Sequence, residues 1–350
     1  MVDLTRQLEQ QVQHAYATKT PLKIQAGNTK AGLGRETTGE VVDMANHAGV
    51  ISYSATELVI RARAGTKISL LNDLLAEQHQ RLPFDPPNFQ GEATIGGTVA
   101  VNQAGASRPW FGSVKDSLLG LGLINGYGEA MQFGGQVMKN VAGFDVTRLQ
   151  CGAMGSLGLI TDVSIKVLPE FKASHTLTFE MAADGALEAM LRWANLSLPI
   201  TGMSHFKGLL YVRLQGGDSG VASASLFLGG EQLEPKHADD FWQAIKEGRL
   251  LQPQHNQTLW RWSGPSDVSI QAPIHAETKQ SLINWAGSER WVLEEGPTPP
   301  LEGLIQYKGG DRLAEVYGAV SAPQQALQQR IKYAFDPHGI LNAGRLYSWM

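Results

Sequence analysis

Cysteine is almost absent from this sequence, which has a single thiol, Cys151, among its 350 residues. One thiol cannot form a disulfide within the chain, and on its own it cannot hold an iron–sulfur cluster or a structural zinc ion. No neighbouring residue in the sequence obviously activates it, so we expect a small core residue rather than a reactive thiolate. The low cysteine content agrees with a reducing compartment.

Long apolar runs and an excess of charge of one sign are also missing. No run approaches the ~18 apolar residues of a membrane helix, and the N-terminal stretch MVDLTRQLEQQVQHAYA has no apolar core of the kind that secretory signals contain. The formal net charge is −4, which gives no reason to expect binding to nucleic acid or to an anionic membrane. We therefore expect a cytoplasmic chain, which a partner protein could hold at the inner membrane.

Histidines are present, but they are scattered along the second half of the chain at His175, His205, His237, His255 and His275. None of them forms a pair at the spacing that metal sites use. We expect each to be a surface or core histidine, and we expect no metal site. The sequence singles out no catalytic base.

Composition and the distribution of clustered glycines predict a globular protein of two domains and a tail. Hydrophobic residues make up 43% and charged residues 18%, which is typical of a globular chain of this length. Clustered glycines become rarer near residue 170. We therefore predict a first domain over 1–170, a second α/β domain over 171–320, and a turn-rich C-terminal segment over 321–350.

Hydrophobic periodicity predicts the main elements. The chain should open with an amphipathic helix that Pro21 ends, and Thr66 should cap a second helix over 67–80. A third helix should start at Asp218 or Ser219 and end at Gly229-Gly230. In the first domain, strands are predicted at 22–25, 57–63 and 157–168, and a further strand is predicted where Leu119, Leu121 and Leu123 alternate with Gly120 and Gly122.

A loop of small residues follows the first predicted strand, within Ile24-Gln25-Ala26-Gly27-Asn28-Thr29-Lys30. Successive backbone N–H groups in such a turn can converge into a concave anion site, because no large side chain blocks the approach. An ordinary surface turn is the alternative. The glycine spacing matches neither a Rossmann fingerprint nor a P-loop.

Two further segments have the same character, at residues 94–100 (TIGGTVA) and residues 152–161 (GAMGSLGLIT). Glycine is needed where something bulky and flat must approach the backbone closely. The second segment could equally be a tight crossing in the core, and the third could be a simple turn.

The order of these three segments, with PFDPP at 83–87 before the second, resembles the FAD-binding domain of the vanillyl-alcohol-oxidase and p-cresol-methylhydroxylase (PCMH) type. The resemblance covers residues 1–170 and returns at 335–345 (FDPHGILNAGR), which is similar to the ending of the D-lactate and glycolate dehydrogenase branch. It implies an α+β fold with a two-subdomain FAD-binding domain, a smaller α/β cap domain, and a C-terminal tail that returns to the FAD domain.

Three consecutive stretches narrow the resemblance. Residues 107–116, 124–126 and 133–145 look like the FAD-binding E subunits of glycolate oxidases. That family implies a complex that oxidises glycolate to glyoxylate and passes the electrons to a second, catalytic FAD subunit and to an iron–sulfur subunit. A self-sufficient FAD-dependent oxidoreductase acting on a hydroxy acid or an alcohol is one alternative. A structural subunit that holds flavin without turnover is another.

The same resemblance implies the cofactor contacts. The first loop would wrap the pyrophosphate, the second segment would line the phosphates and the ribityl chain, the third would approach the adenine or flavin end, and the tail would approach the isoalloxazine. The residues implied are Gln25, Ala26, Gly27, Asn28, Thr29, Lys30, Pro86, Thr94, Gly96, Gly97, Thr98, Gly155, Gly158, Ile160, Asn342 and Arg345.

Two positions bear on how the flavin is held. Covalent members of the wider family carry a histidine in the first loop, at the position that Thr29 takes in this sequence, so we expect non-covalent FAD. Arg345 could stabilise an anionic reduced flavin, or it could form a surface salt bridge. Ala343 replaces the family's usual proline, which loosens the turn before this arginine.

Overall fold

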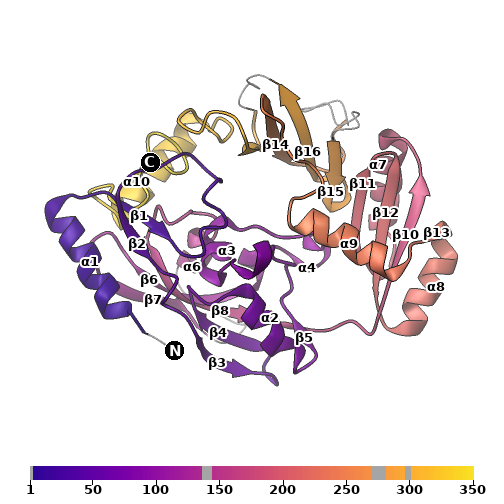
Figure 1. Ribbon diagram of the computed structural model, residues 1–350, viewed down its shortest axis with the longest axis horizontal. Helices are drawn as coiled ribbons and strands as arrows, with labels where there is room; N and C mark the ends of the chain where they lie inside the picture. The colour runs from indigo at the N-terminus through magenta and orange to yellow at the C-terminus, as the bar shows by residue number, and fades with distance from the viewer. Residues whose placement is uncertain (1–2, 136–143, 270–280, 296–300) are drawn as a thin grey trace. The chain divides into compact units, whose positions relative to one another are not determined.

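The computed structural model describes residues 3–135, 144–269, 281–295 and 301–350, and it divides into two compact units (Figure 1). Unit 1 comprises Met1–Gln103, Gly112–Pro169 and Arg312–Met350, and unit 2 comprises Ala104–Phe111 and Glu170–Asp311. The sequence did not indicate that the short segment 104–111 belongs with the second unit. The assignment of a cofactor domain and a cap domain to these parts of the chain stays a prediction.

The smaller sheet of unit 1 carries the first glycine loop. Strands β1 (Leu22–Gln25) and β2 (Glu40–Asp43) pair in parallel. Leu341 forms a parallel bridge with Leu22: the N–H of Leu22 donates to Ile340 O at 2.7 Å, and the N–H of Asn342 donates to Leu22 O at 3.0 Å. The end of the chain is thus fixed beside the strand that leads into the loop.

The larger sheet of unit 1 is antiparallel, with strand order β3-β4-β8-β6-β7. Two of its three inner strands, β6 and β8, are almost wholly buried. The alternation in β8 therefore does not mark an exposed face, because its polar residues Asp162 and Ser164 are only 8% and 2% exposed. The strands of this sheet are β3 (Val50–Ser54), β4 (Val59–Arg63), β6 (Leu118–Ile124), β7 (Ala130–Gly134) and β8 (Leu159–Lys166). A separate short pair consists of β5 (Gln80–Arg81) and β9 (Leu168–Pro169).

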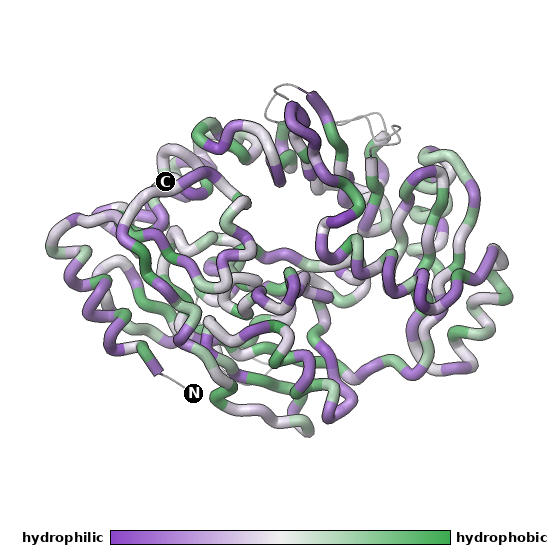
Figure 2. The backbone as a smooth tube through the Cα atoms, viewed as in Figure 1, coloured by the Kyte–Doolittle hydropathy of each residue, from purple (hydrophilic) through white to green (hydrophobic). Residues whose placement is uncertain are grey.

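The helices of unit 1 match their predicted ends less closely than the strands do. Both α1 and α2 end before the predicted position. Helix α1 ends at Thr18, with Lys19 in the left-handed conformation, before Pro21 is reached. In Figure 2, α1 is mostly purple, with the isolated hydrophobic positions of an amphipathic helix. The helices are α1 (Thr5–Thr18), α2 (Ile68–Ala76), α3 (Ile95–Val101), α5 (Val114–Ser117), α6 (Val146–Gln150), α10 (Ala322–Phe335) and the 3₁₀ turn η1 (Phe89–Gly91).

The prediction that Thr66 caps α2 is wrong. Lys67 takes the cap position in an extended conformation and makes no side-chain cap bond. The Thr66 hydroxyl instead accepts a hydrogen bond from the N–H of Gly49 at 2.9 Å. The hydroxyl bonds a residue 17 positions away in the sequence instead of the backbone of the helix that follows it. Local spacing does not reveal such a partner.

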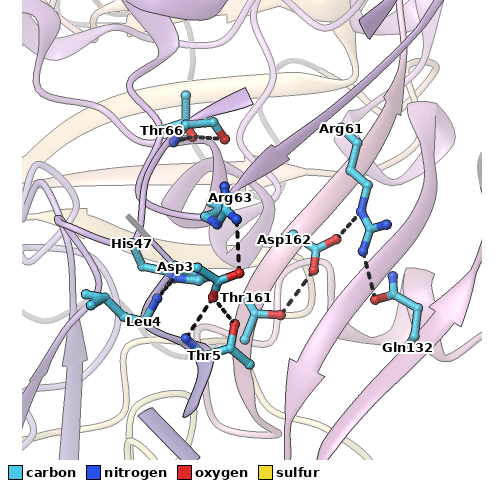
Figure 3. A network of polar contacts seen from close by, with 11 residues as sticks. Asp3, Leu4, Thr5, His47, Arg61, Arg63, Thr66, Gln132, Thr161 and Asp162 are labelled. Atoms are coloured by element: carbon cyan, nitrogen blue, oxygen red, sulfur yellow. Dashed lines mark hydrogen bonds and ion pairs between the residues drawn. The ribbon is translucent and has the colours of Figure 1, made fainter. Parts of the chain in front are cut away.

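A polar network ties the start of α1 to the larger sheet (Figure 3). The N–H of Leu4 donates to Nδ1 of His47 at 3.0 Å, and Asp3 forms an ion pair with Arg63 at 2.9 Å. Deeper in the sheet, Arg61 pairs with Asp162 at 2.7 Å. His47 is only 1% exposed, and burial, the largest effect, lowers its pKa. The imidazole is therefore held in its neutral, hydrogen-bond-accepting form.

Unit 2 is built on one antiparallel sheet with strand order β13-β10-β12-β11-β15-β16-β14-β17. Helix α7 packs its apolar face on this sheet in a core that includes Met190, Trp193 and Met203. The strands are β10 (Ala173–Glu180), β11 (Ile200–Phe206), β12 (Leu209–Gly216), β13 (Glu231–Gln232), β14 (Gln257–Ser263), β15 (Ser281–Asn284), β16 (Glu289–Glu295) and β17 (Leu304–Lys308). The helices are α4 (Arg108–Phe111), α7 (Ala183–Ala194), α8 (Asp218–Leu228), α9 (Pro235–Lys246) and the turn η2 (Trp285–Gly287).

Helix α8 begins where the sequence predicted, although its cap differs. Gly217 occupies the cap position, no side chain caps the helix, and Asp218 is already its first residue. The predicted end is confirmed, since Gly229 follows the last helical residue with φ of 70°. Within the described ranges, the structure has no helix that is both long and apolar enough to span a membrane.

Candidate cofactor-binding site

Unit 1 contains a pocket with a cavity volume of about 140 Å³, and chain segments far apart in sequence line it. The loop after β1, the start of α3, the glycine loop before β8 and the C-terminal tail all contribute. Fourteen of the residues singled out from the sequence lie on its wall: Gln25, Ala26, Gly27, Asn28, Thr29, Lys30, Thr94, Gly96, Gly97, Gly155, Gly158, Ile160, Asn342 and Arg345. Pro86 and Thr98 do not line it, and both are buried elsewhere in the unit.

The loop after β1 offers a row of unused donors. In the described parts of the chain, no acceptor takes the backbone N–H groups of residues 26–29. Asn28 has φ of 54°, the left-handed conformation that curls successive N–H groups toward one point. Gly27 is required there, because a Cβ would come within 1.8 Å of the carbonyl oxygen of Glu92. The loop is thus shaped as an anion-binding nest.

The charge of the lining matches that donor set. Lys23, Lys30 and Arg345 are on the wall, and the described lining residues include no carboxylate. Lys30 is 9% exposed, and its ammonium lies 5.2 Å from the centre of the Phe89 ring. An anion entering the pocket would therefore meet cations and N–H groups without a competing negative side chain.

The second glycine segment is a short helix, α3, and most of its donors are already used. The N–H of Ile95 donates to Thr66 O at 2.9 Å, and that of Gly96 donates to Ala64 O at 2.8 Å. The N–H of Gly97 reaches the cap side chain of Thr94 at 3.3 Å. The segment therefore offers the pocket a close backbone surface rather than free donors.

Three residues of this segment, Gly96, Gly97 and Thr98, differ in how tightly they are packed. A Cβ on Gly96 would come within 2.5 Å of the Cβ of Ala64, so this glycine is required by packing inside unit 1. The hydroxyl of the wholly buried Thr98 donates to Thr94 O at 3.0 Å, which directs the side chain into the helix. Gly97 faces the pocket with more room, since a Cβ there would meet Thr94 Oγ1 at 3.1 Å.

The third glycine loop is docked on the end of α3. The N–H of Gly152 donates to Val99 O at 3.0 Å, and that of Met154 donates to Ala100 O at 2.8 Å. Met154 and Gly155 both have positive φ, of 50° and 73°. A Cβ on Gly155 would meet the side-chain nitrogen of Asn342 at 2.8 Å, so glycine lets the tail approach the loop.

Asn342 joins two walls of the pocket. Its Oδ1 accepts from the N–H of Ile24 at 2.9 Å, and its Nδ2 donates to Met154 O at 2.6 Å. Asn342 is 6% exposed, and its backbone φ is 41°. Both ends of the amide are therefore used to hold β1 against the third glycine loop.

Arg345 braces the first loop from the other side. Its guanidinium donates to the carbonyl oxygens of Arg35 at 3.1 Å, Lys30 at 3.3 Å and Ala31 at 3.0 Å. Burial, followed by the charge of Arg312, lowers its pKa to about 10. The alternative of a surface salt bridge does not describe these contacts, since the acceptors are backbone carbonyls.

The sequence analysis missed several lining residues, and Thr37 is the most informative. Its side chain is 5% exposed and lines the pocket, yet Oγ1 has no hydrogen-bond partner within the described structure. A buried hydroxyl without a partner is costly, so Thr37 is a candidate to bond a ligand in the pocket. No spacing or motif around Thr37 signals this role. The other lining residues outside the predicted set are Lys23, Ile24, Ala31, Met44, Ala64, Ala100, Val101 and Met154.

Cys151 lies near the third loop, but it is not activated. Its Sγ donates to Asn102 Oδ1 at 3.4 Å, and burial raises the pKa of the thiol to about 12. Among the described residues, no group of three or more histidine, cysteine, aspartate or glutamate side chains could hold a metal ion. His275 and residues 136–143 of the motif at 133–145 lie outside the described residues.

The donors, the charge and the unpaired hydroxyl together fit a dinucleotide. A nest of N–H groups with lysines nearby suits a diphosphate, and the glycine-lined wall allows a flat group to approach the backbone. The buried Thr37 hydroxyl provides a polar partner inside the pocket. These features agree with bound FAD.

Comparison with known proteins supports this assignment. The model of the family described as "FAD binding domain" matches residues 2–134. Glycolate oxidase subunit GlcE of Escherichia coli K12 is 40% identical over 99% of this chain and 98% of that protein. Glycolate oxidase subunit GlcD of Bacillus subtilis is 35% identical, but over only 27% of this chain and 20% of that protein.

More distant matches extend over most of the chain. D-2-hydroxyglutarate dehydrogenase of Xanthomonas citri pv. viticola is 25% identical over 85% of this chain and 77% of that protein. The solved structure of an alkyldihydroxyacetonephosphate synthase superposes with a TM-score of 0.68 over 96% of this chain and 74% of that chain, at 15% identity. This confirms the predicted α+β, PCMH-type fold with its FAD-binding domain. The chain therefore belongs to the GlcE family of FAD-binding glycolate oxidase subunits.

Proposed function

We propose that this chain is the FAD-carrying subunit of a glycolate oxidase complex, which oxidises glycolate, or a close 2-hydroxy acid, to the 2-oxo acid. The observation that carries the proposal is the pocket of unit 1. It has a nest of unused N–H groups at residues 26–29 and three cations, in a chain that shares 40% identity with GlcE over its length. The related hydroxy-acid dehydrogenases support the same reaction class.

The chain's own residues would hold and orient the cofactor. Residues 26–29, with Lys30, would bind the diphosphate, and Gly97 and Gly155 would admit flat or extended parts of FAD against the backbone. Thr37 would give its hydroxyl a partner on FAD. Arg345 would act by fixing the first loop, since its guanidinium donates to carbonyls of that loop. Bound FAD would supply the acceptor for the two electrons of the oxidation.

The cofactor is proposed to be non-covalent. The described residues that line the pocket include no histidine or cysteine that could bond a flavin methyl group. Thr29 lies in the first loop, where covalent relatives were expected to carry histidine. Cys151 is not among the lining residues, and its raised pKa keeps the thiol protonated.

The partners follow from the names of the relatives. GlcE and GlcD are both named as subunits of glycolate oxidase, so we propose assembly with a second FAD subunit that carries the catalytic set. An iron–sulfur subunit would take electrons onward in single steps, because the sequence has only one cysteine with which to ligate a cluster. Unit 2 would serve as the cap or interface domain, and the complex would associate with the inner membrane through its partners.

An anaerobic titration tests whether this subunit turns over by itself. The FAD-loaded chain would be mixed with glycolate, first alone and then with the GlcD-type partner, while the flavin absorbance is recorded. We expect bleaching only in the presence of the partner. Bleaching of the isolated chain would instead favour the self-sufficient oxidoreductase. Flavin in this subunit that stays oxidised even in the turning-over complex would favour a structural subunit.

A further inference from the structure

A buried lysine at the end of α10 has every donor of its ammonium group in use. Lys332 is 6% exposed, and its Nζ donates to Ser156 O at 2.7 Å, to Asp336 Oδ2 at 2.7 Å and to Leu341 O at 2.9 Å. An ammonium group has three N–H bonds, so this set is complete. Ser156 lies in the third glycine loop, and Leu341 lies in the tail. Lys332 therefore joins two separate parts of unit 1.

Asp336 completes the same cluster from the tail side. Its carboxylate is 1% exposed and also accepts from the N–H of Ile340 at 3.0 Å and from that of Leu341 at 2.7 Å. The chain turns there into the segment that pairs with β1. A buried charge pair with its hydrogen bonds satisfied fixes geometry strongly, because removing either partner leaves an uncompensated charge.

The cluster reaches the pocket through one residue on each side. Leu341 precedes Asn342, which bonds both Ile24 and Met154 on the pocket wall. Ser156 follows Gly155, another lining residue. Lys332 and Asp336 do not themselves line the pocket. Any effect that they have on a ligand there would act through the backbone positions of the two walls.

Besides Lys332, α10 is held at its last residue, where the carbonyl oxygen of Phe335 accepts from the N–H of Gly126 at 2.8 Å. Of the 14 residues of this helix, only Lys332 is buried, while Leu327 is 54% and Tyr333 is 69% exposed. Few apolar contacts therefore hold the helix on unit 1. Lys332 connects the helix to the glycine loop through its hydrogen bond to Ser156 O.

We propose that Lys332 and Asp336 are positioning residues of the FAD pocket. They set the separation of its two walls, the third glycine loop and the Leu341–Asn342 turn, without touching the cofactor. The proposal rests on the proposed function, because it takes FAD as the ligand of this pocket. Binding is reciprocal, so FAD that spans the two walls also stabilises the attachment of α10.

The test compares Lys332→Met, Lys332→Arg and Asp336→Asn with the unaltered chain by titrating FAD fluorescence. We expect FAD affinity to fall by about tenfold or more in Lys332→Met and in Asp336→Asn, which corresponds to coupling of ordinary size. Lys332→Arg, which keeps a buried cation and donors, should stay nearer to the unaltered chain. Val12→Ala is the control, because Val12 is a buried residue of α1 and does not line the pocket.

A second readout separates positioning from general stability. Chymotrypsin cleavage after Tyr333 reports local opening of α10. FAD should slow this cleavage in the unaltered chain and in Val12→Ala, but not in Lys332→Met. Where Lys332→Met fails to fold, Asp336→Asn and Lys332→Arg decide the outcome.

The outcomes distinguish the two proposals. If the unaltered chain binds no FAD, the proposed function fails first. If it binds FAD, and folded Lys332→Met and Asp336→Asn bind it within about twofold of the same affinity, the positioning role is overturned. A loss of affinity as large in Val12→Ala as in the cluster variants would also overturn it, since it would then reflect stability alone.

Discussion

At the scale of single residues, Thr37 gives the sharpest prediction about the pocket. Its buried hydroxyl has no partner within the described structure, so Thr37→Val should leave the FAD-free chain as stable as before or slightly more stable. FAD affinity should fall by about fivefold to tenfold, which is the effect of losing one hydrogen bond of ~1 kcal/mol. Thermal unfolding without FAD and fluorescence titration with FAD measure the two effects separately.

Two matched variants accompany this test. Thr37→Ser keeps the hydroxyl and should keep most of the affinity. Thr56→Val makes the same change at an exposed position that does not line the pocket, and it should change neither quantity. If Thr37→Val lowered the stability of the FAD-free chain and left FAD affinity unchanged, the hydroxyl would have a partner within the protein instead.

His47 predicts a dependence of stability on pH. Burial lowers its pKa below the usual value of ~6.5, and its Nδ1 accepts the N–H of Leu4. The unfolded chain therefore takes up a proton at a higher pH than the folded chain does. The free energy of unfolding should fall as pH drops from about 6.5 toward the lower folded value.

Burial also lowers the pKa of His205, so this residue adds to the same slope. His47→Asn, measured by urea unfolding between pH 7.5 and 5, should therefore flatten the pH dependence without abolishing it. A change of the exposed His14 to Asn is the control. A slope as steep in His47→Asn as in the unaltered chain would mean that His47 does not titrate in this way.

At the scale of elements, α3 separates a glycine needed for packing from a glycine needed at the pocket. Alanine is favoured over glycine in a helix by ~1 kcal/mol, but a Cβ on Gly96 would meet Ala64 at 2.5 Å. Gly96→Ala should therefore destabilise the FAD-free chain by about 1–3 kcal/mol, as overpacking does. Urea unfolding of the FAD-free chain measures this.

Gly97→Ala, one residue later, should show the opposite pattern. A Cβ there meets only Thr94 Oγ1 at 3.1 Å, and the position lines the pocket. We expect stability within about 1 kcal/mol of the unaltered chain, because propensity offsets the mild contact, together with clearly weaker binding of FAD. Equal FAD affinity in Gly97→Ala would show that no part of the cofactor approaches this backbone.

At the scale of the whole molecule, FAD should stabilise one unit and leave the other unchanged, because all lining residues lie in unit 1. Of the eight tryptophans in the sequence, all except Trp349 lie in unit 2, so tryptophan fluorescence reports mainly on that unit. FAD at 100 times its dissociation constant should stabilise unit 1 by about 2.7 kcal/mol. Calorimetry should show the transition of unit 1 moving upward, while the tryptophan transition stays in place.

A shift of both transitions by the same amount would mean that the units unfold as one cooperative body. A shift of the tryptophan transition alone would contradict the placement of the pocket in unit 1.

The sequence predicted those parts of the molecule that depend on local chemistry. The strand and loop at residues 22–30 and the glycine loop before β8 follow from short-range patterns of small and apolar residues. It did not predict α3 as a helix, because two adjacent glycines conceal the helical pattern. Hydrogen bonds to the carbonyls of Ala64 and Thr66, which lie outside the segment, stabilise this helix. The unpaired hydroxyl of Thr37 at the pocket and the hydrogen bonds of Lys332 were also missed, since each depends on what lies across the fold rather than along the chain.

The central claim is that this chain binds FAD reversibly in the pocket of unit 1, and direct titration of the purified, flavin-stripped chain tests it. The account predicts saturable binding of one FAD per chain, release of all the flavin on acid denaturation, and loss of affinity in Thr37→Val. Absence of binding under any reconstitution condition would contradict the account, and flavin that stays attached to the denatured chain would contradict its non-covalent part.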